Sequence, residues 1–222
     1  MAKIAVLLSG CGHMDGSEIH EATCALLALD AAGAEVVCCA PDAEQADVTD
    51  HVTRKPSGAP ARNMLIEAAR IARGNIVPVG EITPEDFDAL VIPGGLGAAR
   101  NLCDFAATGA DCTVRPDVER LIGSMLDAGK PVGAICIAPA LLARVCGRKG
   151  IEATLTIGDD PATAAAIERM GATHAACRAT DAVCDEPHKV VSTPAYMLAR
   201  GPAEVYQGVT RLVEHVLRLA GG

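Results

Sequence analysis

The chain has 222 residues, half of them apolar, and a formal net charge of −9. One hydrophobic core can serve a chain of this length, so we expect a single domain over residues 1–222. The basic residues form no cluster and a negative field repels phosphate backbones and anionic lipid, so we expect neither nucleic acid nor a membrane surface as a partner.

Short apolar runs alternate with longer amphipathic stretches from the start of the chain, which is typical of βαβ units and a parallel sheet. Lys3 to Ser9 predicts the first strand, and Glu35 to Ala40 predicts the second. Between them, Ser17 is the expected N-cap of a helix that carries Glu18 and Glu21 in its first turn.

The middle of the chain begins with residues 41–60, a polar, turn-rich excursion from the sheet. The elements expected after it are a helix at Arg62 to Arg73, a short strand at Asn75 to Val79, a helical turn at Pro84 to Phe87 and a buried strand at Ala89 to Pro93. Gly94-Gly95-Leu96-Gly97 then predicts a glycine-rich turn at the carboxyl end of that strand.

The second half repeats the alternation and ends in a helix. The expected elements are a helix at Val114 to Ala128, a buried strand at Pro131 to Ile135, helices at Leu141 to Cys146 and Pro161 to Met170 with a strand at Thr154 to Ile157 between them, a β-hairpin of Ala182 to Cys184 and Val190 to Thr193, and a helix at Pro202 to Leu219. The order predicts an α/β fold with a mainly parallel sheet and helices on both faces.

Ten cysteines do not require a disulfide framework in a chain that can build a full core, so we expect reduced thiols, most of them small core residues. No Cys-x-x-Cys and no zinc-ligand spacing is present, which argues against a metal site. The first apolar run, Ile4 to Leu8, is too short for a signal-peptide core or a membrane span. We therefore expect a cytoplasmic protein.

Cys136 is the strongest candidate for chemistry because it stands in Gly133-Ala134-Ile135-Cys136-Ile137-Ala138-Pro139, a buried strand that runs directly into a helix. Small residues two places away on each side suit the tight turn of a nucleophile elbow. A helix N-terminus favours a thiolate, so we expect Cys136 to be the most reactive thiol. The alternative is that Cys136 is one more buried core cysteine.

The glycine-rich turn adds backbone donors to this prediction. The N–H groups of Gly95 and Ile137 are expected to form an oxyanion hole beside Cys136, at the carboxyl edge where parallel sheets place their ligands. The alternative for the glycines is a plain tight turn that needs positive φ angles.

Several ordered runs resemble a known family. The glycine-rich turn, the elbow and the glutamate that opens the first helix resemble the class I glutamine amidotransferase-like superfamily, in the branch of PfpI and the parkinsonism-associated deglycase. The narrower resemblance is to the ElbB isoprenoid-biosynthesis glyoxalases of the sigma cross-reacting protein type. It lies in Leu8-Ser9-Gly10-Cys11-Gly12, Asp15-Gly16-Ser17-Glu18-Ile19-His20-Glu21, Cys136-Ile137-Ala138-Pro139-Ala140 and Thr193-Pro194-Ala195-Tyr196-Met197-Leu198-Ala199.

The resemblance implies a flavodoxin-like three-layer sandwich, a homodimer and a cofactor-independent, glutathione-independent glyoxalase with a small dicarbonyl aldehyde as substrate. Cys136 is implied as the nucleophile, Glu18 as the carboxyl group that faces it, and Gly95 with Ile137 as the oxyanion donors. A carboxyl group close to a dry thiolate should be mostly protonated, with a raised pKa. The alternative for Glu18 is a partner of the helix dipole.

The sequence departs from amidotransferases and protease-like relatives, because Ile137 follows the cysteine and Thr154 to Gly158 offers no imidazole. A Cys-His-acid triad is therefore not expected, nor is amide hydrolysis, in which an acid must protonate the leaving amine. A non-catalytic or redox-sensing accessory protein remains the alternative to a slow glyoxalase, and an amidotransferase subunit or a deglycase is a third possibility.

Four other features have simpler explanations. Gly10-Cys11-Gly12 fits a dinucleotide fingerprint poorly, because the next glycine is Gly16. His13 and His20 are expected to be solvated or capping, although catalysis or metal binding is open to them. Cys11 is expected to be structural unless its loop borders a pocket, and His188 should be exposed in its hairpin turn.

Overall fold

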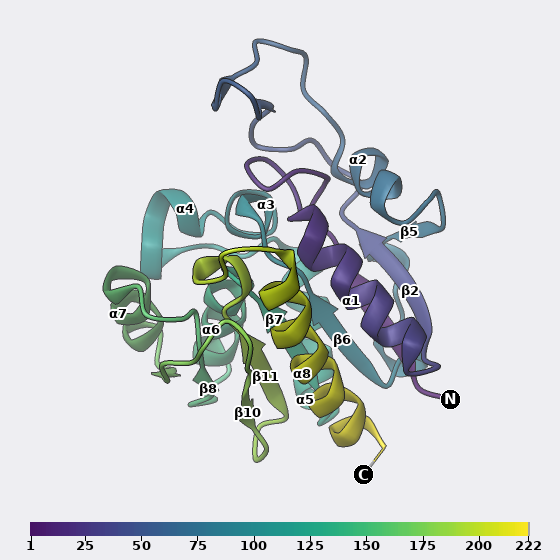
Figure 1. The fold of residues 1–222 in the computed structure, drawn as a ribbon, viewed down its shortest axis with the longest axis vertical. Coiled ribbons are helices and arrows are strands. Elements are labelled where there is room, and N and C mark those ends of the chain that lie inside the picture. The colour runs from purple at the N-terminus through teal and green to yellow at the C-terminus, as the bar shows by residue number, and fades with distance from the viewer. Residues whose placement is uncertain (222) are drawn as a thin grey trace.

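A seven-stranded sheet forms the middle of the computed structural model, which describes residues 1–221. Its strand order is β10-β11-β7-β6-β1-β2-β5 (Figure 1). These strands are β1 (Lys3–Leu7), β2 (Glu35–Ala40), β5 (Ile76–Pro78), β6 (Ala89–Ile92), β7 (Val132–Ile135), β10 (Val183–Asp185) and β11 (Val190–Thr193). Every neighbouring pair is parallel except the β10–β11 hairpin, as the sequence predicted.

Helices cover both faces of the sheet and complete the three layers. On one face, α1 (Ile19–Ala31) and α8 (Pro202–Ala220) lie side by side, with α2 (Met64–Ile71) near the β5 edge (Figure 1). The other face carries α3 (Leu96–Arg100), α5 (Pro116–Asp127), α6 (Ala138–Arg148) and α7 (Pro161–Arg169), with α4 (Phe105–Thr108) beside α3. Short 3-10 turns occupy Val79–Glu81, Pro84–Asp86, Gly109–Asp111 and Ala195–Met197.

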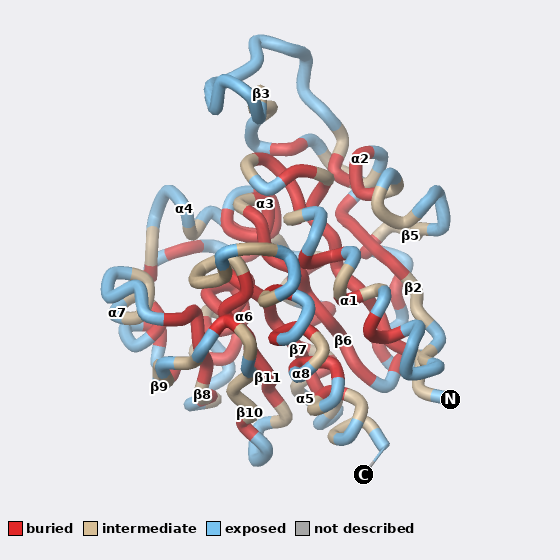
Figure 2. The backbone as a smooth tube through the Cα atoms, in the orientation of Figure 1, coloured by how far each residue is buried: buried red, intermediate tan, exposed pale blue. Residues whose placement is uncertain are grey.

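The two cores lie on opposite faces of the sheet because side chains alternate along each strand. In β1, Ile4 and Val6 join the core under α1 and α8, whereas Ala5 and Leu7 join the core under α5 and α6. The central strands are buried on both sides (Figure 2), which explains their continuous apolar sequences.

Residues 41–60 lie outside the main sheet, as expected, and carry the two-stranded hairpin of β3 (Thr49–Asp50) and β4 (Lys55–Pro56). This segment forms the exposed projection at the top of Figure 2. The predicted strand at Thr154 to Ile157 is shorter, β8 (Thr154–Leu155), and pairs with β9 (Thr173–His174) in a separate two-stranded sheet beside β10 and β11. Within residues 1–221, none of the helices combines the length and apolarity that a membrane span requires.

The N-terminus of α1 differs from the prediction by one residue. Glu18, and not Ser17, is the N-cap, and its carboxylate Oε2 accepts the N–H of Glu21 at 2.7 Å. Ser17 is fully buried instead, where its hydroxyl accepts the N–H of Ser9 at 2.9 Å. This shift turns Glu21 toward the core.

Candidate active site

Cys136 stands at the elbow that the sequence predicted, between β7 and α6. Its φ angle is +61°, a left-handed conformation that non-glycine residues rarely adopt and that strained nucleophile turns require. The N–H of Cys136 donates to the carbonyl of Thr193 at 2.9 Å, which ties the elbow to the end of β11. The residue is 8% exposed, and it lines a cavity at the carboxyl edge of the sheet.

Gly94, directly after β6, leaves room for the side chains that meet at this elbow. A Cβ atom at Gly94 would lie 2.5 Å from the Cβ of Cys136 and 2.6 Å from Oε2 of Glu21. Separations this short do not occur between real atoms, so the close approach of thiol and carboxyl group depends on glycine at this position.

The loop that leads into α1 is fixed to the turn after β6 by three backbone hydrogen bonds. Glu18 N–H donates to the Gly94 carbonyl at 2.9 Å, and Leu96 N–H donates to the His13 carbonyl at 2.7 Å. Gly97 N–H donates to the Gly16 carbonyl at 3.0 Å. The first turn of α1 is therefore held against the β6–α3 connection, and its side chains reach the elbow.

Glu21 is the carboxyl group that meets the thiol. It is fully buried, and it lies close enough to the Cys136 side chain that a Cβ at Gly94 would touch both. Its Oε2 accepts the N–H of Gly94 at 3.0 Å, and its Oε1 accepts the N–H of Tyr196 at 3.2 Å. Burial, reinforced by the nearby charge of Glu18, raises the pKa of Glu21 to about 8. Glu21 is thus mostly protonated at neutral pH.

The structure corrects the expected position of Glu18. Glu18 lines the cavity, but its carboxylate caps α1, whereas Glu21 takes the place against Cys136 that we expected for Glu18. The physical reason is the one-residue shift of the N-cap, which aligns Glu21 with Ala25 and Ala28 on the buried face of the helix. The raised pKa that we expected for the facing carboxyl group belongs to Glu21.

The Cys136 thiol is less acidic than we expected. Burial raises its pKa well above the usual value, and the charge and hydrogen bond of Glu21 raise it further. The N–H groups of Gly95 and Ile137 act on the sulfur in the opposite direction and do not outweigh these effects. A helix N-terminus alone therefore does not produce a free thiolate here, and the role of the two N–H groups as an oxyanion hole stays a prediction.

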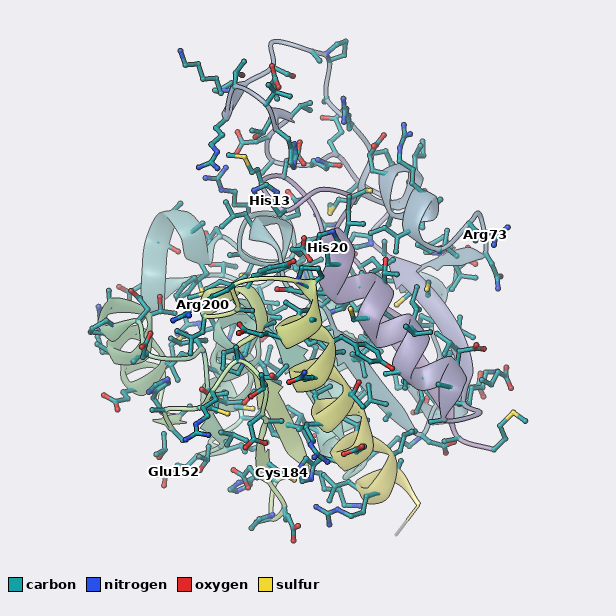
Figure 3. All side chains as sticks on the ribbon, viewed as in Figure 1. His13, His20, Arg73, Glu152, Cys184 and Arg200 are labelled. Carbon is teal, nitrogen blue, oxygen red and sulfur yellow. The ribbon has the colours of Figure 1, made fainter. Side chains whose placement is uncertain are left out.

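A cavity of about 540 Å³ opens above Cys136. Its lining consists of His13, Glu18, His20, Gly95, Leu96, Cys136, Ile137, Tyr196 and Met197. His13 and His20 are exposed and lie at the same end of the molecule (Figure 3). All four residues that we predicted for the site border this cavity.

Sequence reasoning missed Tyr196 and gave His20 no place in the site. Tyr196 follows Ala195, whose φ angle of +41° turns the Tyr196 N–H toward Glu21. The Tyr196 hydroxyl lies 2.6 Å from Nδ1 of His20. Two features of the sequence could have pointed to them. Tyr196 lies in the run from Thr193 to Ala199 that carries the family resemblance, and His20 lies between Glu18 and Glu21 in the sequence.

The other candidates lie away from the thiol. Gly12 and Gly16 make room for the chain itself, because a Cβ at Gly12 would lie 2.7 Å from Nε2 of His51 and one at Gly16 would collide with Cys11.

Cys11 does not line the cavity, and its pKa is raised by burial and by Glu67. His188 is exposed in its turn, and all ten cysteines are free thiols. No cluster of three metal-ligating side chains occurs in residues 1–221.

Comparisons with known proteins show which family this chain resembles. The DJ-1/PfpI family model matches residues 3–186. A human protein, glutamine amidotransferase-like class 1 domain-containing protein 3, mitochondrial, is 42% identical over 99% of this chain and 84% of its own length. The zebrafish ES1 protein, mitochondrial, is 34% identical over 97% of this chain and 85% of its own length. These mitochondrial relatives overturn the expectation of a cytoplasmic protein, which rested on the short first apolar run.

Solved structures agree with the fold. An isoprenoid biosynthesis protein with an amidotransferase-like domain from Ehrlichia chaffeensis superposes with a TM-score of 0.91 at 36% identity, covering 99% of both chains. Drosophila melanogaster DJ-1beta superposes with a TM-score of 0.52 at 18% identity, covering 100% of this chain and 96% of that one, and supports the fold alone. The flavodoxin-like sandwich expected from the sequence is confirmed.

Proposed function

The chain belongs to the DJ-1/PfpI family of class I glutamine amidotransferase-like proteins, and on this premise we propose that it is a glutathione-independent glyoxalase. Its substrates would be glyoxal and methylglyoxal, and its products glycolate and lactate. The observation that carries the proposal is the close approach of Cys136 and the fully buried Glu21 beside Gly94, at the wall of an open cavity. It pairs a nucleophile with a group that can both give and take a proton near neutral pH.

The first step joins the sulfur to the aldehyde carbon. Cys136 and Glu21 titrate as a pair, and the form that holds one proton between them is the reactive one. The sulfur attacks the aldehyde, the carbonyl π electrons move to its oxygen, and that oxygen takes the proton from Glu21. The product is a hemithioacetal, and Glu21 is left as a carboxylate.

The second stage moves hydrogen from one carbon to the next. The Glu21 carboxylate removes the hydrogen of the former aldehyde carbon, and the electrons move into a carbon–carbon double bond. The hydroxyl proton of this carbon passes to the neighbouring carbonyl oxygen, and Glu21 returns its own proton to the second carbon. The result is a thioester of a 2-hydroxy acid on Cys136. Water then cleaves the carbon–sulfur bond, which releases the acid and restores the thiol.

Within the family, we place the chain with the ElbB isoprenoid-biosynthesis glyoxalases. The runs around Cys136 and Thr193 support this placement, as does the similarity to the Ehrlichia protein. Amide hydrolysis fits the site less well, because an amine leaves only when an acid protonates it and Ile137 follows the nucleophile.

An accessory or redox-sensing role without turnover is the second candidate. The specific observation in its favour is the burial of Cys136, which raises the pKa of the thiol and slows its attack on any carbonyl. The carboxyl group of Glu21 favours the enzyme, because a scaffold has no need of a buried titratable partner beside the thiol.

The test is turnover without glutathione. Wild-type protein should convert methylglyoxal to lactate, and Cys136→Ser should not, because a serine hydroxyl is a far weaker nucleophile than a thiolate and the mostly protonated Glu21 is a poor base for it at neutral pH. Lactate is measured enzymatically in the absence of any added thiol. If wild type forms no more lactate than Cys136→Ser, the glyoxalase proposal is wrong and the accessory role takes its place.

A further inference from the structure

Among the cavity side chains that take no part in the steps assigned to Cys136 and Glu21, two are joined to each other by a hydrogen bond. His20 and Tyr196 both line the cavity that contains Cys136. The Tyr196 hydroxyl lies 2.6 Å from Nδ1 of His20, a short hydrogen bond, and the ring centroids are 5.8 Å apart. Nε2 of His20 has no hydrogen-bond partner among the residues that the structure describes, so this nitrogen is free to meet a ligand.

The conversion of a 2-oxoaldehyde to a 2-hydroxy acid needs two separate proton movements. One hydrogen moves from carbon to carbon, which is the work of Glu21. Another moves from the oxygen of the hemithioacetal to the oxygen of the neighbouring carbonyl. Glu21 is buried, and each of its oxygens already accepts a backbone N–H, from Gly94 and from Tyr196. The second movement is therefore better served by another group of the cavity.

We propose that His20 is a catalytic residue that carries this second proton, and that Tyr196 is its positioning residue. The proposal rests on the glyoxalase function proposed above. It assigns the oxygen-to-oxygen transfer to Nε2 of His20 and assigns the orientation of the ring to the hydroxyl of Tyr196.

The proton balance closes without any added reagent. Nε2 of a neutral His20 takes the proton from the hydroxyl of the hemithioacetal. As the Glu21 carboxylate removes the carbon-bound hydrogen, electrons move into a carbon–carbon double bond and the second carbonyl oxygen takes the proton back from His20. Glu21 then protonates the second carbon, and the first oxygen closes to the thioester carbonyl. His20 ends neutral, as it began.

Tyr196 is placed to align both proton carriers at once. Its backbone N–H binds Oε1 of Glu21, and its hydroxyl binds His20, the residue before Glu21 in α1. A hydrogen bond at one ring nitrogen fixes the tautomer and the orientation of the other nitrogen. With Nδ1–H donated to the Tyr196 oxygen, Nε2 carries the lone pair that accepts the proton. His13, the other imidazole of the cavity, packs edge-on against His51 at 5.0 Å instead.

The experiment compares His20→Ala and Tyr196→Phe with wild type for lactate formation from methylglyoxal. A lost proton carrier typically lowers the rate by about 10² or more, so kcat of His20→Ala should fall about 100-fold. Tyr196→Phe keeps the ring and the backbone N–H, and its kcat should fall about tenfold. Adding free imidazole should raise kcat of His20→Ala at least about tenfold above its value without imidazole. Imidazole can reach the position because His20 is exposed and its removal leaves the site open.

The controls separate this role from a structural one. His215→Ala removes an imidazole from α8, outside the cavity, and should leave kcat within about twofold and show no response to imidazole. Cys136→Ser with imidazole gives the background. If His20→Ala turns over like wild type, or loses activity that imidazole does not restore, the role of His20 is wrong while the glyoxalase proposal stands. If wild type makes no more lactate than Cys136→Ser, both proposals fail.

Discussion

The raised pKa of Glu21 makes the stability of the protein depend on pH in a defined direction. The folded pKa of about 8 lies above the usual value of 4.5, so between these values the folded state holds a proton that the unfolded state has released. The free energy of unfolding must therefore fall as pH rises from about 5 to 8. With these two pKa values, the loss due to Glu21 over this range is about 3 kcal/mol.

Glu21→Gln removes this titration and keeps a polar side chain of the same shape. The difference in unfolding free energy between Glu21→Gln and wild type should therefore shift by about 3 kcal/mol in favour of the variant between pH 5 and pH 8. Urea unfolding followed by circular dichroism at several pH values measures it. Glu168→Gln, at an exposed glutamate of α7, should follow wild type at every pH. A constant difference between Glu21→Gln and wild type would refute the assignment of Glu21 as a protonated buried acid.

Two further predictions concern the packing and the acidity of the thiol. Gly94→Ala should lower the free energy of unfolding by about 2 kcal/mol or more, because its Cβ would lie 2.5 Å from that of Cys136, whereas Gly80→Ala, with open space around it, should change it by less than about 0.5 kcal/mol. Comparable urea midpoints for the two variants would contradict this packing. Iodoacetamide should alkylate Cys136 about tenfold faster in Glu21→Gln than in wild type at pH 9, because the ionised Glu21 opposes the thiolate and a like charge typically shifts a pKa by a unit or more. Peptide mapping of Cys136 measures this ratio, and equal rates would show that the charge of Glu21 does not reach the sulfur.

The sheet could be predicted because its strands are short apolar runs closed by glycine or proline. Ala89 to Pro93 and Pro131 to Ile135 have no polar side chain that could face water, which leaves a strand buried on both faces as the remaining choice. The helix α3 was missed because Gly94-Gly95-Leu96-Gly97 reads as a turn, and α4, which spans only Phe105–Thr108, is too short to show a helical period. In the fold, Gly97 lies in α3 beside Gly16 and Ser9, a close approach that the sequence does not reveal.

The site could be predicted in part, because a nucleophile elbow has a local sequence but its partners come from distant elements. Cys136, Gly95 and Ile137 follow from strand ends, which a parallel sheet brings to one edge. The choice between Glu18 and Glu21 depends on a single helix boundary, and Ser17 was a reasonable N-cap by residue type. The spacing of Glu21 to Ala25 and Ala28 was the signal that favoured Glu21. The contact of Tyr196 with His20 spans most of the chain and has no local signature.

In the proposed reaction Glu21, and not Glu18, moves the proton for Cys136. The direct measurement is lactate formation from methylglyoxal by Glu21→Gln and Glu18→Gln beside wild type, with the hemithioacetal on Cys136 followed by its protection from alkylation. Glu21→Gln should still protect Cys136 but lose product formation by roughly two orders of magnitude or more. Glu18→Gln keeps an oxygen that can accept the Glu21 N–H, so it should retain activity within about threefold. Turnover of Glu21→Gln at the wild-type rate, or loss of product in Glu18→Gln instead, would contradict this role of Glu21.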